Sequence, residues 1–138
     1  MPLTLTLTEG TLPAGQEKVA ISRLTDAMLK WHGLSGNQAM KSGITATVHW
    51  LPKASTFAAG EEAAGVWVEW RTPSFAFLSE EIQRGFFTDA AAIIHDLSGG
   101  RHPKERIYFN VVHAVDGAWS FQGRAMTNAE MGAAIAKS

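Results

Sequence analysis

Two stretches of the chain carry the same order of hydrophobic patterns, and this repeat limits the possible folds more than any other feature. In each stretch, apolar residues first recur at every second position, which predicts a strand, and then at every third or fourth position, which predicts a helix. A second strand pattern closes each stretch. The expected elements are strands at 2–8 and 44–51 around a helix at 13–32, and strands at 66–71 and 106–113 around a helix at 79–98.

Corresponding elements lie 64 or 65 residues apart, so we interpret the chain as two β-α-β units of similar length. Each unit is too short to fold alone, and both helices have to cover the same sheet. Right-handed crossovers make the two strands of each unit parallel. The fold class is therefore α/β (α+β), with one four-stranded sheet and two helices on one face.

The rest of the chain adds connections and one short hairpin. Residues 34–43 and 53–64 are expected to be loops. Asp116-Gly117 is a hairpin turn signal, after which 118–122 is expected to return as a short strand. We expect a single domain over 1–138, with pseudo-repeats at 2–64 and 65–125 and an alanine-rich helical tail at 126–138.

A ferredoxin-like α/β sandwich has the same order of elements and remains an alternative at this point. It differs in having antiparallel strands on either side of each helix. In the duplicated layout, one face of the sheet carries no helix, and its apolar residues need another cover. Charged residues make up only 18% of the chain, below the roughly 25% usual for soluble domains, which favours a partner subunit on that face.

Charge and composition exclude several partners. The 12 Lys and Arg residues are balanced by 13 Asp and Glu, so no basic excess attracts a nucleic acid. No apolar run approaches the roughly 20 residues that span a bilayer, and the N-terminus lacks the pattern of a secretory signal. The chain has no cysteine, which excludes disulfides and thiol chemistry and fits a cytoplasmic protein.

Pro2 is the first candidate for chemistry, because removal of Met1 exposes its nitrogen as a free secondary amine. Burial, or a nearby cation, disfavours the charged form of such an amine and lowers its pKa. A neutral amine at pH 7 is a competent general base. Proline at the start of a strand is also structurally acceptable without any catalytic role.

Several segments resemble the 4-oxalocrotonate tautomerase superfamily. The start at Pro2, the threonine-rich strand and Glu9-Gly10 before a long helix are similar to that family, which uses an amino-terminal proline as acid/base on a β-α-β fold. The stretches at 41–49 and 106–110 resemble its macrophage migration inhibitory factor branch, and 116–125 resembles the hairpin of its malonate semialdehyde decarboxylase branch. The larger members fuse two units in one chain, as the repeat suggests here.

The resemblance implies roles for particular residues. Pro2 matches the catalytic base, and Lys41 matches a pocket lysine able to bind a carboxylate. Tyr108 and Asn110 match two further pocket residues. Arg71 is expected at a strand end beside Pro2, where a guanidinium holds a carboxylate bidentately. The remaining substrate-binding candidates are Trp119 of the hairpin, expected to wall the pocket of a neighbouring subunit, and Arg124. Each cation has an alternative role as a surface or ion-pair residue.

The departures from the family pattern favour its simplest reaction. Thr11 stands where the 4-oxalocrotonate type has an arginine, and Arg71 is single where the decarboxylase and dehalogenases have two arginines. Asn37 and Gln38 occupy the loop in which the decarboxylase carries a catalytic aspartate. Hydration and decarboxylation need those groups, whereas keto–enol tautomerisation needs one base, one cation and an apolar pocket.

We therefore expect a tautomerase acting on small 2-keto or enol carboxylates, with no cofactor and no metal site. The resemblance implies a homotrimer. The alternatives are a catalytically silent binding protein on the same scaffold and a decarboxylase or hydratase of the same superfamily. Retention of Met1 favours the silent protein, since the nitrogen of Pro2 is then an amide. The sequence does not identify the physiological substrate.

Overall fold

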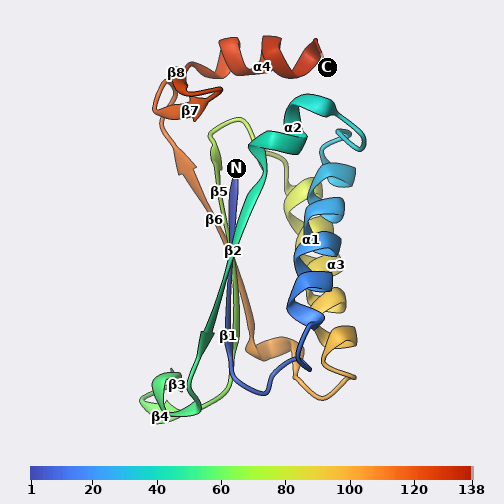
Figure 1. Ribbon diagram of the computed structural model, residues 1–138, viewed down its shortest axis with the longest axis vertical. Coiled ribbons are helices and arrows are strands. Elements are labelled where there is room, and N and C mark those ends of the chain that lie inside the picture. Colours follow the sequence, from blue (N-terminus) through green and yellow to red (C-terminus); the bar gives the residue numbers. More distant parts are fainter. Residues whose placement is uncertain (138) are drawn as a thin grey trace.

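A single four-stranded sheet forms the centre of the computed structural model, which describes residues 1–137 (Figure 1). The strands lie in the order β2-β1-β5-β6. β1 pairs with β2 in parallel, β5 pairs with β6 in parallel, and β1 and β5 are antiparallel. Their bounds are β1 (Pro2–Thr8), β2 (Thr45–Leu51), β5 (Val66–Pro73) and β6 (Ile107–Ala114). Parallel pairing inside each unit rules out the ferredoxin-like alternative.

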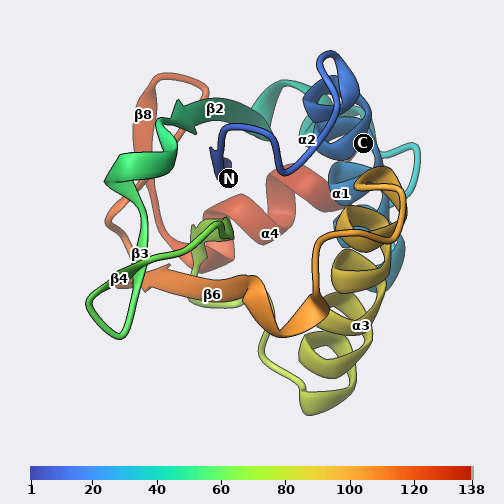
Figure 2. The ribbon, with the colours of Figure 1, turned by 90° about the horizontal axis from the view of Figure 1, so that it is seen from below.

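Two long helices, α1 (Gln16–Trp31) and α3 (Glu80–Leu97), cover one face of this sheet (Figure 2). β5 begins 64 residues after β1, and α3 begins 64 residues after α1. The leucines of the Leu/Thr alternation in β1 point towards these helices and are fully buried: Leu3, Leu5 and Leu7. The expected fold class, a duplicated β-α-β sheet with two helices on one face, is confirmed.

A close contact between α1 and α3 is possible because α3 has a glycine on its inner surface. The Trp31 ring lies over Gly85, where an added Cβ would come within 2.3 Å of the ring. The Trp31 indole N–H donates a hydrogen bond of 2.8 Å to Asp89 in the next turn of α3. Gly85 and Trp31 together set the distance between the two helices at this level.

Within residues 1–137, the other face of the sheet carries no helix, as expected (Figure 2). The Trp67 and Tyr108 rings stack there with centroids 5.5 Å apart. Glu69 accepts a hydrogen bond from Asn110 Nδ2 and another from Arg71 Nε, each 3.1 Å long. Tyr108 and Val112 are 38% and 44% exposed. This helix-free face therefore presents aromatic and aliphatic side chains around a small polar group.

The expected loops contain short elements. The structure has α2 (Gln38–Gly43) inside residues 34–43, so that loop prediction was wrong over its second half. The Asn37 side chain caps α2 by accepting a hydrogen bond from the Met40 N–H. Residues 53–64 contain η1 (Lys53–Ser55) and the two-stranded ribbon of β3 (Phe57–Ala58) and β4 (Glu61–Glu62). A further short helix, η2 (Lys104–Arg106), precedes β6.

The hairpin also differs from the sequence-based expectation. β7 (Trp119–Phe121) pairs with β8 (Arg124–Met126), not with β6. The turn of this hairpin is Gln122-Gly123, and both residues have positive φ, as a tight two-residue turn requires. Asp116-Gly117 does form a turn, closed by a hydrogen bond of 3.0 Å from the Ala118 N–H to Val115 O, but this turn leads from β6 to β7 without pairing them. The Asp116 carboxylate also accepts a hydrogen bond from the Asn128 N–H. The tail forms α4 (Asn128–Ala136), as expected.

Among the helices of residues 1–137, none has the length and apolar character that a bilayer crossing requires.

Candidate functional site

A cavity of about 510 Å³ lies at the N-terminal end of β1. Three segments that are distant in the sequence form its walls: the start of β1, the junction of α2 with β2, and the β7–β8 hairpin. Figure 1 shows the chain start between α2 and this hairpin, below α4. The lining residues are Met1, Pro2, Ser42, Gly43, Thr45, Trp119, Ser120, Phe121 and Gln122.

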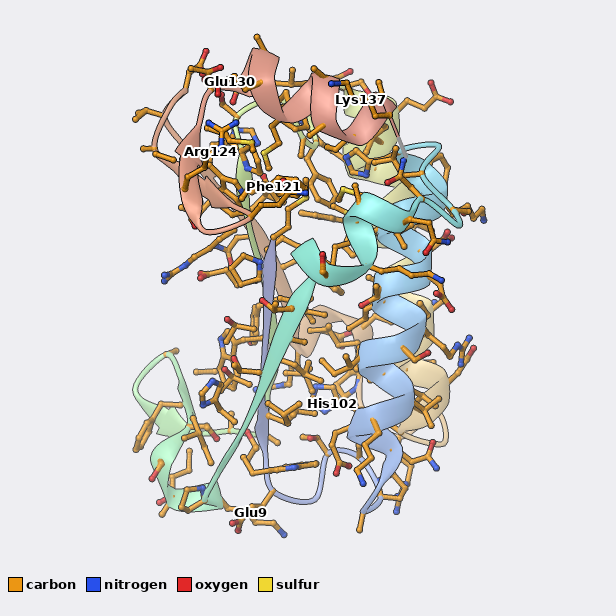
Figure 3. All side chains as sticks on the ribbon, turned by 45° about the horizontal axis from the view of Figure 1, so that its top comes forward. Glu9, His102, Phe121, Arg124, Glu130 and Lys137 are labelled. Carbon is orange, nitrogen blue, oxygen red and sulfur yellow. The ribbon has the colours of Figure 1, made fainter. Side chains whose placement is uncertain are left out.

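Contacts on both sides hold the hairpin over the chain start. The Phe121 side chain reaches from the hairpin towards α2 (Figure 3), where its ring lies against Gly43, 3.3 Å from the position of an added Cβ. α4 follows the hairpin directly and is anchored by Asn128, whose Nδ2 donates to Ser74 Oγ at 2.7 Å. At its other end, Ile135 O accepts from Asn37 Nδ2 at 3.1 Å. The hairpin is thus one wall of a fixed cavity.

The α-amino group of Met1 lies inside this wall. It donates a hydrogen bond to Gly43 O, and burial lowers its pKa from 8.0 to about 6. The Met1 carbonyl oxygen accepts from the Thr45 N–H, with 3.4 Å between nitrogen and oxygen. The Met1 side chain is only 5% exposed. The end of β1 is therefore a place where an amine loses its preference for the charged form.

Arg71 lies beside Pro2 on the helix-free face. Leu3 is opposite Trp70 in the β1–β5 ladder, and one further step of this antiparallel register places Pro2 opposite Arg71. Nε of Arg71 is bonded to Glu69, while the two terminal nitrogens of its guanidinium make no hydrogen bond within residues 1–137. The hydrogen bond from Asn110, together with Arg71, lowers the pKa of the Glu69 carboxyl. Arg71 is not among the residues that line the cavity, but it keeps hydrogen-bonding capacity close to Pro2.

The structure places the other expected residues apart from one another. Trp119 lines the Pro2 cavity of its own chain. Lys41 lines a separate cavity of about 270 Å³ between α1 and α2, beside Asp26. Tyr108 and Asn110 lie on the helix-free face, outside the cavity of their own chain.

Arg124 is at the outer side of the hairpin (Figure 3), where its Nη1 donates to Glu130 Oε2 at 3.0 Å. This bond lowers the pKa of the Glu130 carboxyl. Arg124 therefore joins β8 to α4 in this chain and is not among the residues that line the Pro2 cavity.

Sequence reasoning did not single out the polar residues that line the cavity. Ser42 and Thr45 belong to a stretch from which only Lys41 was selected, and Ser120 and Gln122 flank Phe121 in the hairpin. A signal for Thr45 exists, because it lies directly opposite Pro2 in the parallel β1–β2 ladder. To identify Thr45 as a lining residue, the register of β1 against β2 has to be known, and the amino-acid composition does not supply it.

The five histidines are used within the fold. His32 accepts a hydrogen bond from the Phe77 N–H at 3.0 Å, and burial lowers its pKa. Three others bond to backbone carbonyls and one bonds to a hydroxyl: His95, His102, His113 and His49. Across residues 1–137, no three side chains of the metal-binding types come together.

No protein-family model matches the sequence, and no curated protein matches it either. Solved structures do match. The crystal structure of Pt0534 inactivated by 2-oxo-3-pentynoate has a TM-score of 0.73 and 18% identity, covering 96% of this chain and 99% of that chain. A member of the cis-3-chloroacrylic acid dehalogenase family has a TM-score of 0.74 and 14% identity, covering 96% and 89%.

A fused 4-OT (4-oxalocrotonate tautomerase) wild-type symmetric trimer has a TM-score of 0.74 and 14% identity, covering 96% of this chain and 99% of that chain. These similarities extend over nearly the whole of both chains, so they concern the complete arrangement of two units and hairpin rather than one β-α-β unit. The chain has the fused two-unit fold of the tautomerase superfamily.

Proposed function

We propose that this protein catalyses keto–enol tautomerisation of small 2-keto or enol carboxylates, with the nitrogen of Pro2 as general acid and base after removal of Met1. The observation that carries the proposal is the buried α-amino group of Met1 at the end of β1, whose pKa burial lowers to about 6, beside a cavity of about 510 Å³. Pro2 lines the same cavity, and its nitrogen becomes the chain's amine once Met1 is removed.

In the proposed reaction, the neutral nitrogen of Pro2 takes a proton from the enol hydroxyl or from the carbon next to the carbonyl. The electron pair moves through the conjugated system, and the protonated amine returns the proton at the other end. Because one group accepts and then donates, its pKa has to lie near the working pH. Trp119 and Phe121 surround this step with apolar surface, in which charges interact more strongly than in water.

Arg71 is the residue that we assign to the substrate carboxylate. Its position opposite Pro2 and its unused terminal nitrogens support this role. A bidentate guanidinium–carboxylate contact would hold the reacting carbon at a fixed distance from the amine. Lys41 is a less direct candidate, because it lines the separate cavity beside Asp26.

Tautomerisation is favoured over decarboxylation or hydration because of the contacts that Asn37 makes. Those reactions need a second acid or base where the chain has this asparagine. Its Oδ1 accepts from the Met40 N–H and its Nδ2 donates to Ile135 O, so both side-chain groups are used in structural hydrogen bonds.

A proton-NMR screen of enol and 2-keto acids on protein whose mass shows the loss of Met1 tests this function. We expect ketonisation of at least one acid, such as phenylpyruvate or 2-hydroxymuconate. Arg71→Ala should weaken reaction of the acids by roughly 10-fold or more, the scale of a lost charged hydrogen bond, and leave matched neutral ketones unaffected. Equal loss for acids and ketones would contradict the assignment of Arg71, and no turnover of any acid would contradict the function.

We further propose a homotrimer that buries the helix-free face. Support comes from the exposed Tyr108 and Val112 on this face and from the trimeric state of fused 4-OT, which has the same fold. Arrangement around a threefold axis would bring Tyr108 and Asn110 of one subunit towards its neighbour. Sedimentation equilibrium should give three times the mass of the 14.9 kDa chain, and the mass of a single chain would contradict the trimer.

A further inference from the structure

The backbone of Met1 fills the gap between β2 and β5 at the end of β1. On the β2 side, its carbonyl oxygen accepts from the Thr45 N–H, and its amino group donates to Gly43 O. Removal of Met1 takes away both the acceptor of the Thr45 N–H and the donor to Gly43 O. The Thr45 N–H then has no acceptor, and it points into the place that the Met1 carbonyl occupied.

On the β5 side of the same gap lies Thr72, a fully buried residue on the helix-covered face. Its hydroxyl is one of the few buried polar groups of residues 1–137 with no hydrogen-bond partner. Continuing the β1–β5 register from Leu3 and Trp70 by two steps places Thr72 opposite Met1. The buried Met1 side chain and Thr72 point to the same side of the sheet, so removal of Met1 opens a space next to this hydroxyl.

A buried hydroxyl without a partner is unfavourable unless it has a use, because it gives up its hydrogen bonds to water. Thr8, at the other end of β1, shows the usual arrangement. Its hydroxyl is equally buried, donates to Thr56 at 2.9 Å and accepts from the Gly65 N–H at 2.9 Å. Within residues 1–137, the Thr72 hydroxyl lacks any such contact, and the extended register places Thr72 opposite Met1, the residue whose removal frees the Pro2 nitrogen.

We propose, building on the function proposed above, that removal of Met1 creates the site for the substrate's oxygens. The Thr45 N–H binds the carbonyl oxygen where the Met1 carbonyl lay, and the Thr72 hydroxyl donates to a second oxygen from the opposite edge. The substrate is a compact molecule with oxygens on neighbouring carbons, such as a 2-keto acid. Its reacting carbon then lies next to the nitrogen of Pro2.

The dimensions of the gap agree with such a ligand. Two strand spacings separate the backbones of β2 and β5 by about 9.5 Å. A hydrogen bond of about 3 Å from the Thr45 N–H on the β2 edge leaves a space only several ångströms across. Two oxygens on adjacent carbons fit this space, whereas a bulky group does not. Donors fixed in the protein stabilise the negative charge that develops on the carbonyl oxygen when the proton moves to the amine.

Thr72→Val tests the proposal, because it removes the hydroxyl and keeps the shape. In Met1-free protein, kcat/KM for an active 2-keto acid should fall about 10- to 100-fold, the scale of a lost hydrogen bond to a charged group. The melting temperature should stay the same or rise, since a hydroxyl without a partner is replaced by a methyl group. Thr72→Ser should retain most of the activity.

Thr8→Val is the matched control. This buried threonine loses real hydrogen bonds, so its melting temperature should fall while kcat/KM of the folded protein stays unchanged. A Thr72→Val protein with unchanged kcat/KM would overturn the role of Thr72. A fall of kcat/KM together with a Thr8-like loss of melting temperature would also overturn it, because both would then follow from a structural role.

A second measurement does not depend on turnover. In ¹⁵N–¹H spectra of Met1-free protein, added oxalate, which carries oxygens on adjacent carbons, should shift the Thr45 amide proton downfield, and Thr72→Val should reduce this shift. An unperturbed Thr45 amide at saturating oxalate would overturn the proposal. If oxalate shifts Thr45 but no enol acid is converted, the oxygen site stands and the proposed reaction fails, so the two failures are distinguishable.

Discussion

Replacing Pro2 by alanine in Met1-free protein should lower kcat/KM for enol-acid ketonisation by about 100-fold or more, the scale of general acid–base catalysis. Alanine keeps a free amine at the same place but changes it from a secondary to a primary amine and removes the rigid ring. The cavity walls from β2 and the hairpin stay intact. Steady-state kinetics on mass-verified protein measures the effect, and equal activity of both proteins would remove Pro2 from the mechanism.

The pH profile provides a second readout of the same group. Only the neutral amine accepts a proton, so kcat/KM should rise with pH through the pKa of the amine and level off above it. Since burial lowers the pKa of the Met1 amine at this end of β1, we expect the rise at a lower pH than for a solvent-exposed prolyl amine. The Met1-retaining chain should be inactive at every pH because its Pro2 nitrogen is an amide, and activity of that form would support a different base.

The second large effect concerns stability. Gly85→Ala should lower the free energy of unfolding by about 1–3 kcal/mol, the usual cost of overpacking. The new Cβ comes within 2.3 Å of the Trp31 ring, so the ring has to move and its hydrogen bond to Asp89 is lost. Urea unfolding followed by Trp fluorescence and by circular dichroism measures the change.

Gly132→Ala is the matched control, because Gly132 lies inside α4 and an added Cβ there meets no atom within 4 Å. Alanine in an exposed helix interior gains about 0.5–1 kcal/mol over glycine. Glycine-to-alanine substitution should therefore lower the free energy of unfolding in α3 and raise it in α4. Stabilisation by Gly85→Ala would show that the contact with Trp31 does not limit the approach of α1 and α3.

The main features of the fold were predictable because period and spacing determine them. The Leu/Thr alternation of β1 fixed which side chains face the helices, and Ser79 caps α3 by accepting from the Ile82 N–H. The handedness rule for crossovers then gave parallel pairing within each unit. The antiparallel pairing of β1 with β5 joins residues that are far apart in the sequence, so no local pattern predicts it.

The elements that were missed are short and have too few buried residues to show a period. α2 spans six residues and buries only Met40, so its main signal is the cap at Asn37. The hairpin was placed around the wrong turn: Asp116-Gly117 does form a turn, but the strand that follows it pairs with β8 rather than with β6. The true turn contains Gln122 with positive φ, which sequence statistics do not favour for glutamine.

The candidate site was predictable only in part. Pro2 and Trp119 line one cavity of the same chain, whereas the sequence-based expectation placed Trp119 at the pocket of a neighbouring subunit. The direction of Lys41 depends on the helical turn of α2, which was missed, and this turn places the lysine at another cavity. Thr45 and Thr72 depend on strand register, and Thr72 is notable only because its hydroxyl lacks a partner.

The opposite directions of β1 and β5 have a consequence for the two halves of the molecule. The second unit begins at Val66 at the far end of the sheet, and Gly65 precedes it in the same polypeptide. Its first nitrogen is locked in a peptide bond, and no aminopeptidase can release it. Fusion of the two halves thus leaves a single end of the sheet, at Pro2, where a free chain-terminal amine can arise. The far end, at Val66, cannot carry the chemistry that we propose for Pro2.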